Sequence, residues 1–172
     1  MILVIHMLII LVSYYCEVKQ MFENTKLPEG MSAETLEHLL HPKNYGKLDN
    51  PSCIGVAADE KTGEYVIFYT LLDGETIKDA RYATNGCQDT VVIGSMFSDM
   101  IIGNDTQYAQ GAIKKMHDRL GVMTPKQQVC ADIVFSAFVA SMINYENLQE
   151  GKTEEMHLLK MKESCEGENN DE

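Results

Sequence analysis

Two cysteines, Cys87 and Cys130, stand where the sequence predicts junctions between secondary-structure elements. Cys87 follows Gly86 in a loop that leads into a helix, and Cys130 lies in the first turns of a later helix. Because the positive end of a helix dipole favours the thiolate, we expect the pKa of a thiol at such a position to fall. Thiolates bind soft metal ions and attack sulfur, whereas a cysteine that only packs in a core is inert. The residue types therefore indicate either a thiolate site or two small buried side chains.

The composition limits the classes of protein to which this chain can belong. The chain has 172 residues with five cysteines, an odd number without a close pairing pattern. This argues against the disulfide framework of a secreted domain and for a reducing, cytoplasmic compartment. Acids outnumber bases 26 to 14, and the formal charge of −12 excludes a binder of the nucleic-acid phosphate backbone. With 45% apolar and 23% charged residues, the chain is expected to form one globular domain.

Three predicted strands are the first of the elements that would position the cysteines. Residues 53–58, 65–72 and 76–85 carry the β-branched and aromatic side chains that are typical of strands. Turn residues at 59–63 and at 73–74 join these segments directly. The sequence therefore predicts a three-stranded antiparallel sheet and excludes a parallel βαβ crossover.

Helical signals precede and follow these strands. A short helix is expected over 32–40, and three more are expected to begin near Asp89, Asp105 and Pro125. Asp89 and Asp105 can cap their helices, and Thr124 before Pro125 is a strong start signal for the last one. A run of strands followed by a run of helices predicts an α+β fold in which the helices cover one face of the sheet.

The two ends of the chain differ from its middle. Residues 1–15 form an apolar run that is shorter than the roughly 20 residues of a spanning helix and lacks the marks of a signal peptide. We expect translation to begin at Met21, since the codons for residues 17–20 can spell a purine-rich ribosome-binding tract; a membrane anchor is the alternative. The predicted organisation is an extension (1–30), a domain (31–147) and an acidic, solvated tail (148–172).

Four segments of the middle, taken in order, resemble one known family. They are HPKNYGKLDNP (41–51), TGEYVIFY (62–69), IKDARYATNGCQDTVVIGSM (77–96) and TPKQQVCAD (124–132). Together they resemble the iron–sulfur cluster scaffolds that comprise the NifU N-terminal domain and IscU. Each motif is loose, but four in sequence with fitting spacings are hard to produce by chance.

The chain departs from the family pattern at two of its ligand positions. The family's first cysteine corresponds to Thr62, and the histidine before its third cysteine corresponds to Val129. The second and third cysteines are kept as Cys87 and Cys130, and the family's aspartate corresponds to Glu64. The resemblance thus implies that the two cysteines bind iron or a transient [2Fe–2S] cluster, with Glu64 as an oxygen ligand. Zinc is a further candidate ion for the isolated protein.

The resemblance also implies where these residues lie. It places Cys87 and Cys130 at one end of the sheet, near the turn that holds Thr62 and Glu64. Cys53 cannot replace the missing cysteine within one subunit, because it lies some distance up the first strand, ~20 Å from Thr62 at roughly 3.3 Å per residue. Cys53 is therefore expected to pack on the sheet.

The implied function is that of a scaffold and not of an enzyme. A cysteine desulfurase would deliver sulfur, a cluster would form on the thiolates, and recipient apo iron–sulfur proteins would take it. No nucleic-acid or membrane partner is expected, and a homodimer stays open. One alternative is a metal-free pseudo-scaffold, an adaptor that keeps the fold and docks on the assembly machinery. The other is a thiol enzyme or sulfur-transfer protein with Cys130 as its nucleophile.

Overall fold

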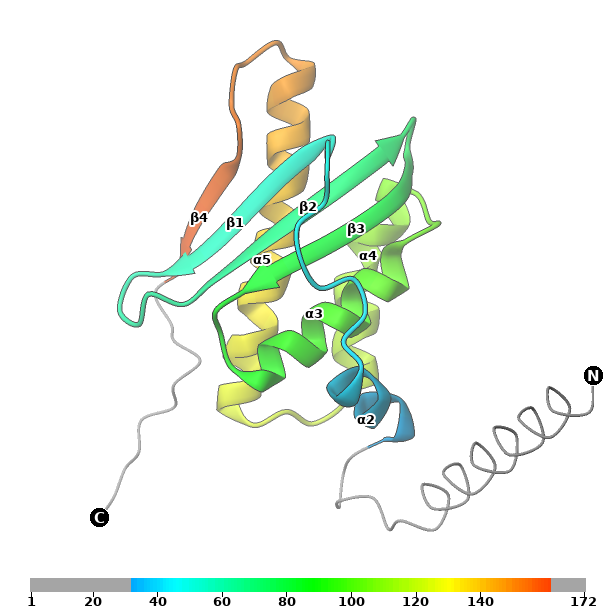
Figure 1. Ribbon diagram of the computed structural model, residues 1–172, viewed down its shortest axis with the longest axis vertical. Helices are drawn as coiled ribbons and strands as arrows, with labels where there is room; N and C mark the ends of the chain where they lie inside the picture. The colour runs from blue at the N-terminus through cyan, green and yellow to red at the C-terminus, as the bar shows by residue number, and fades with distance from the viewer. Residues whose placement is uncertain (1–31, 162–172) are drawn as a thin grey trace, which may run out of the picture. The chain divides into compact units, whose positions relative to one another are not determined.

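The computed structural model describes residues 32–161. The predictions for residues 1–30 and for the chain beyond residue 161 lie outside this range. Within residues 32–161, four helices and four strands follow one another (Figure 1). In chain order they are α2 (Ala33–Leu40), β1 (Cys53–Asp59), β2 (Tyr65–Asp73), β3 (Thr76–Thr84), α3 (Gln88–Ile101), α4 (Thr106–Leu120), α5 (Pro125–Gln149) and β4 (His157–Met161). The α+β class that the sequence predicts is confirmed.

The sheet has four strands, in the order β3-β2-β1-β4. The pairs β1–β2 and β2–β3 are antiparallel as predicted, but β4 runs parallel to β1 along its other edge. The prediction of a three-stranded antiparallel sheet is therefore wrong by this strand, which falls in the segment expected to be a solvated tail. Its side chains alternate between half-buried and exposed, so its short sequence offers little to distinguish it from a polar tail.

One face of the sheet is covered by helices, as predicted. Helix α5 lies on β1 and β2, α3 lies against β3 and α5, and α4 packs beside α3 (Figure 1). The approach of α5 is very close at Gly55, where a Cβ atom would lie 2.0 Å from the backbone nitrogen of Ser141 and 2.2 Å from the carbonyl oxygen of Ala137. Glycine is required there because no other residue leaves room for the helix backbone.

The layers are held together by an aromatic cluster. Phe68 of β2, Phe97 of α3 and Phe138 of α5 are almost fully buried. Their rings meet edge to face, with centroid distances between 5.3 and 6.0 Å. This contact fixes α3 and α5 relative to the sheet, and these are the two helices whose N-terminal parts carry the cysteines.

Two of the three predicted N-caps of helices are confirmed. Asp105 caps α4 by accepting from the backbone of Tyr108, and Thr124 forms a complete capping box with Gln127 at the start of α5. The expected cap at Asp89 is wrong, because the N-cap of α3 is Cys87 and its side chain makes no capping hydrogen bond. Asp89 lies instead inside the first turn of α3, and its carboxylate is available for other contacts.

Among the described residues, α5 is the one helix long and apolar enough to cross a membrane by length and composition. More than half of its most apolar stretch, 56%, is buried within the domain. Such burial is typical of a core helix, because the apolar side chains already face the sheet.

Candidate metal centre

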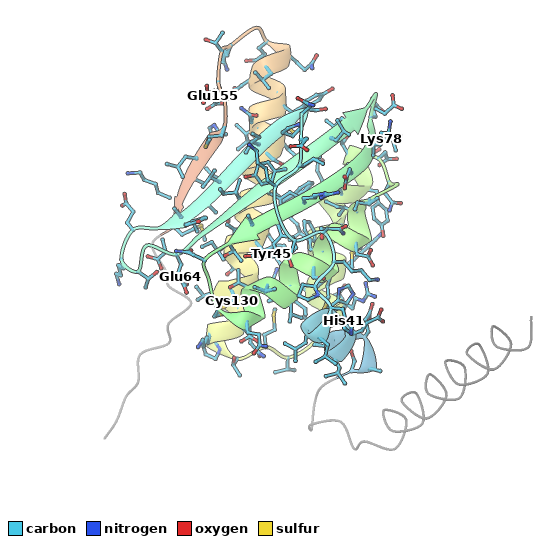
Figure 2. All side chains as sticks on the ribbon, viewed as in Figure 1. His41, Tyr45, Glu64, Lys78, Cys130 and Glu155 are labelled. Atoms are coloured by element: carbon cyan, nitrogen blue, oxygen red, sulfur yellow. The ribbon has the colours of Figure 1, made fainter. Side chains whose placement is uncertain are left out.

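Cys87 and Cys130 meet where α3 and α5 begin. Their Sγ atoms are 3.0 Å apart although the residues are 43 positions apart in the sequence, and both are present as thiols. Cys130, labelled in Figure 2, is buried in the second turn of α5, and Cys87 is half-buried at the start of α3. The expectation that the fold brings these two cysteines to one place is confirmed.

A carboxylate completes this group. Asp89 lies in the first turn of α3, and the ligand atoms of Cys87, Asp89 and Cys130 are all within 4.8 Å of one another. The sequence indicated Asp89 only as a helix cap and not as a residue of this site. The signal that could have found it is its spacing, since a residue two positions after an N-cap cysteine shares the first helical turn with it.

Burial decides the protonation of the Cys87 thiol. Desolvation raises its pKa, and the neighbouring Cys130 raises it further, while hydrogen bonding with Thr90 acts in the opposite direction. The Thr90 hydroxyl lies 3.4 Å from the Cys87 Sγ. The expected fall in pKa at a helix N-terminus is therefore wrong for Cys87, because burial outweighs the helix dipole. A metal ion that binds here must displace the thiol proton.

The turn between β1 and β2 is tied to the same end of the domain by Asn85. The Asn85 Oδ1 accepts from the backbone of Tyr65 at 2.7 Å, and its Nδ2 donates to the carbonyl oxygen of Gly63 at 3.1 Å. Because Asn85 closely precedes Cys87, these bonds hold the turn beside the start of α3. Thr62 is exposed in this turn, and its Oγ1 accepts from the backbone of Glu64.

Glu64 lies at this turn, and Figure 2 shows it at the hairpin end of the sheet. Its Oε2 is buried and has no hydrogen-bond partner among the described residues. Glu64 is not a member of the group of ligand atoms within 4.8 Å that Cys87, Asp89 and Cys130 form in the described part of the chain. Its role as a metal ligand therefore stays a prediction.

Cys53 stands apart from the site. It begins β1, on the helix-covered face and at the far end of the strand from the 59–63 turn. Only 2% of its surface is exposed, and burial raises the pKa of its thiol to about 12. Cys53 is a packing residue, as expected.

The α+β fold, with two cysteines brought together at the starts of two helices, is that of a NifU-like domain. Residues 31–152 match the family model of the NifU-like N terminal domain, and the chain belongs to this family.

Two relatives and one solved structure show how far this likeness extends. The chain is 26% identical over 125 residues to "Iron-sulfur cluster assembly scaffold protein IscU" of Aquifex aeolicus, covering 71% of this chain and 79% of the relative. It is 24% identical over 138 residues to "Iron-sulfur cluster assembly scaffold protein IscU 1" of Archaeoglobus fulgidus, covering 78% and 90%. The crystal structure of a nitrogen-fixing NifU-like protein (N-terminal) from Brucella abortus has a TM-score of 0.51 at 16% identity, covering 67% of this chain and 94% of that one. This structural likeness shows the fold.

Proposed function

We propose that this chain is a scaffold of iron–sulfur cluster assembly, which binds iron or a transient [2Fe–2S] cluster on Cys87 and Cys130 and passes it on. The observation that carries the proposal is the 3.0 Å contact between the two sulfur atoms. The family membership and the printed names of the two relatives support it. The iron and sulfide are cargo, so no catalytic acid or base is assigned.

The residues present suit weak binding of such cargo. Thiolates are the ligands that iron–sulfur clusters prefer, and the site offers two of them beside a carboxylate. The neutral hydroxyl of Thr62 stands where the family has a cysteine, so one sulfur ligand is missing. A cluster held by an incomplete thiolate set dissociates readily, which suits a protein that must release it.

The partners follow from the chemistry of the cargo. A cysteine desulfurase is the proposed source of sulfur, and apo iron–sulfur proteins are the proposed recipients. The proposed place of action is the cytoplasm, where thiols stay reduced. Because zinc prefers the same sulfur ligands, Zn²⁺ is expected to compete with iron in the isolated protein.

A second candidate function is that of a metal-free adaptor that docks on the assembly machinery. The exposed Thr62 favours it, because the position that carries a cysteine in the family here carries a side chain that does not bind iron. Burial also raises the pKa of Cys87, which disfavours the thiolate in the absence of metal.

Anaerobic reconstitution with Fe²⁺ and sulfide separates the two candidates. We expect the full chain to retain iron and acid-labile sulfide after desalting and to show the visible absorption of a cluster. Cys87→Ala should lose both, whereas Cys53→Ala, the matched control, should retain them. A folded parent chain that retains neither iron nor sulfide would favour the adaptor.

A further inference from the structure

Asp89 has a position that the family resemblance does not explain. The resemblance assigns the acidic residue of the site to Glu64, but in the structure the carboxylate that approaches both sulfur atoms belongs to Asp89. Its oxygen lies within 4.8 Å of the Sγ atoms of Cys87 and Cys130. The three side chains come from two helices, and Cys130 is fully buried.

Asp89 is more buried than its stabilising effect on the start of the helix requires. An acid anywhere in the first turn would stabilise the positive end of the dipole while remaining in water. Asp89 is half-buried, whereas the neighbouring Gln88 is exposed. Its carboxylate therefore lies with two sulfur atoms in a group of three metal-ligating side chains, an arrangement that stabilising the helix start does not require.

We propose that Asp89 is the third protein ligand of a site for a single divalent metal ion, together with Cys87 and Cys130. In this site a carboxylate oxygen takes the place of the sulfur that Thr62 does not supply. The inference rests on the proposed function, because it concerns the same two cysteines, and it deepens that function by naming the first ion loaded, Fe²⁺ or the chemically similar Zn²⁺.

The observed distances suit such a site. Around a tetrahedral ion with metal–sulfur bonds of about 2.3 Å, two sulfur ligands lie about 3.8 Å apart. The Sγ atoms of Cys87 and Cys130 are 3.0 Å apart, so they would have to move apart by less than about 1 Å to bind such an ion. Three protein ligands leave a fourth position for water or incoming sulfide, as at sites that keep an exchangeable ligand.

The ligand set also limits which ions bind. Two thiolates and one carboxylate provide both soft and hard donors, which suits Fe²⁺, Zn²⁺ and Co²⁺ better than Cu(I) or Mg²⁺. Binding releases thiol protons, so it should be accompanied by acidification of a weakly buffered solution.

Titration of the reduced full chain with Co²⁺ under argon tests the inference. We expect one Co²⁺ per chain with a thiolate-to-cobalt charge-transfer band. Asp89→Asn should keep this band, since both sulfurs remain, but should weaken binding by about tenfold or more. Asp89→Ser is a second variant should Asp89→Asn fold poorly, and Asp89→Glu should recover part of the affinity. Asp118→Asn, an exposed acid on α4, is the matched control and should bind as the parent does.

The outcomes separate this inference from the proposed function. If Asp89→Asn and Asp89→Ser bind Co²⁺ as tightly as the parent, Asp89 is not a ligand, and the function stands as long as the parent retains iron and sulfide. If the parent binds no Co²⁺ at all, the inference is wrong, and reconstitution with iron and sulfide decides the function alone. If Glu64→Gln loses the affinity and Asp89→Asn does not, the third ligand is Glu64.

Discussion

Asp59 and Glu64 lie opposite each other at the closed end of the β1–β2 hairpin, where the Asp59 backbone nitrogen donates to the Glu64 carbonyl oxygen at 2.8 Å. They continue the facing pairs of β1 and β2, of which Ala57 and Val66 are the nearest on the helix-covered face. Each has one buried carboxylate oxygen, Asp59 Oδ2 and Glu64 Oε2, without a hydrogen-bond partner in the described part of the chain. Two carboxylates therefore share the inner edge of the hairpin.

Glu64→Gln should stabilise the domain. It replaces a carboxylate that has one buried, unpartnered oxygen by a neutral amide, which costs less free energy to bury. We expect a gain of about 0.5–1.5 kcal/mol in the free energy of unfolding, measured with urea at pH 7. Glu75→Gln, in the exposed turn between β2 and β3, is the control and should change little. A lower midpoint for Glu64→Gln would show that the Glu64 carboxylate stabilises the fold.

Thr62→Cys should restore a third sulfur ligand. Thr62 is exposed in a turn, so its replacement should cost no more than about 0.5 kcal/mol of stability. After anaerobic reconstitution the variant should retain more iron and sulfide per chain than the parent, and a further Cys87→Ala change should abolish the gain. A folded variant that binds no more iron than the parent would show that a missing sulfur ligand does not limit the site.

The 3.0 Å separation of the Cys87 and Cys130 sulfurs predicts that a mild oxidant joins them. With diamide, the two thiols give up two protons and two electrons, the oxidant becomes the hydrazine, and one S–S bond forms. Mass spectrometry should show the loss of two hydrogen atoms per chain, and the oxidised protein should no longer bind Co²⁺ until dithiothreitol is added. Cys53→Ala should behave as the parent, because Cys53 is buried elsewhere. A disulfide that includes Cys53 would contradict the structure.

His38 is a buried polar residue that joins α2 to α3. It is 3% exposed, and its Nδ1 lies 2.7 Å from the Ser95 Oγ. The backbone of Lys43 donates to the same oxygen at 2.7 Å. Burial lowers the pKa of His38 below 6.5, and Lys43 lowers it further, whereas the carboxylates of Asp99, Glu34 and Glu37 act in the opposite direction.

The lowered pKa of His38 should make the fold less stable in mild acid. Below pH 6.5, the ordinary pKa of the ring, the unfolded chain binds a proton at this position more readily than the folded chain does. The stability that His38 contributes is therefore present above pH 6.5 and is lost as the pH falls towards the lowered, folded-state pKa. Urea unfolding at pH 7.5 and at pH 5.5 measures this loss. His38→Gln should show a smaller loss than the parent, and an equal loss would assign the pH dependence to other groups.

Local signals in the sequence predicted most of the fold, and a resemblance predicted the pairing of the cysteines. Turn residues and caps such as Asp105 and Thr124 act within a few positions, so the three antiparallel strands and the helix starts could be found. β4 could not, because its pairing with β1 joins segments that are remote in the sequence. Asp89 was misjudged since an aspartate near a helix start satisfies the rule for a cap equally well. Which role it takes depends on whether its carboxylate lies beside Cys130, and the local sequence around Asp89 does not show this.

Gly55→Ala should both destabilise the domain and weaken metal binding at the proposed site. The new Cβ would lie 2.0 Å from the Ser141 backbone nitrogen, so α5 would have to move away from β1. We expect a loss of about 2–3 kcal/mol in urea unfolding, as for an overpacked core. Because Cys130 is carried by the same helix, binding of Co²⁺ should weaken even at temperatures where the variant is folded. Gly111→Ala is the matched control: nothing lies within 4 Å of its Cβ position in α4, and alanine there should add up to about 1 kcal/mol. If Gly55→Ala is as stable as the parent, the backbone of α5 does not pack against β1 at Gly55.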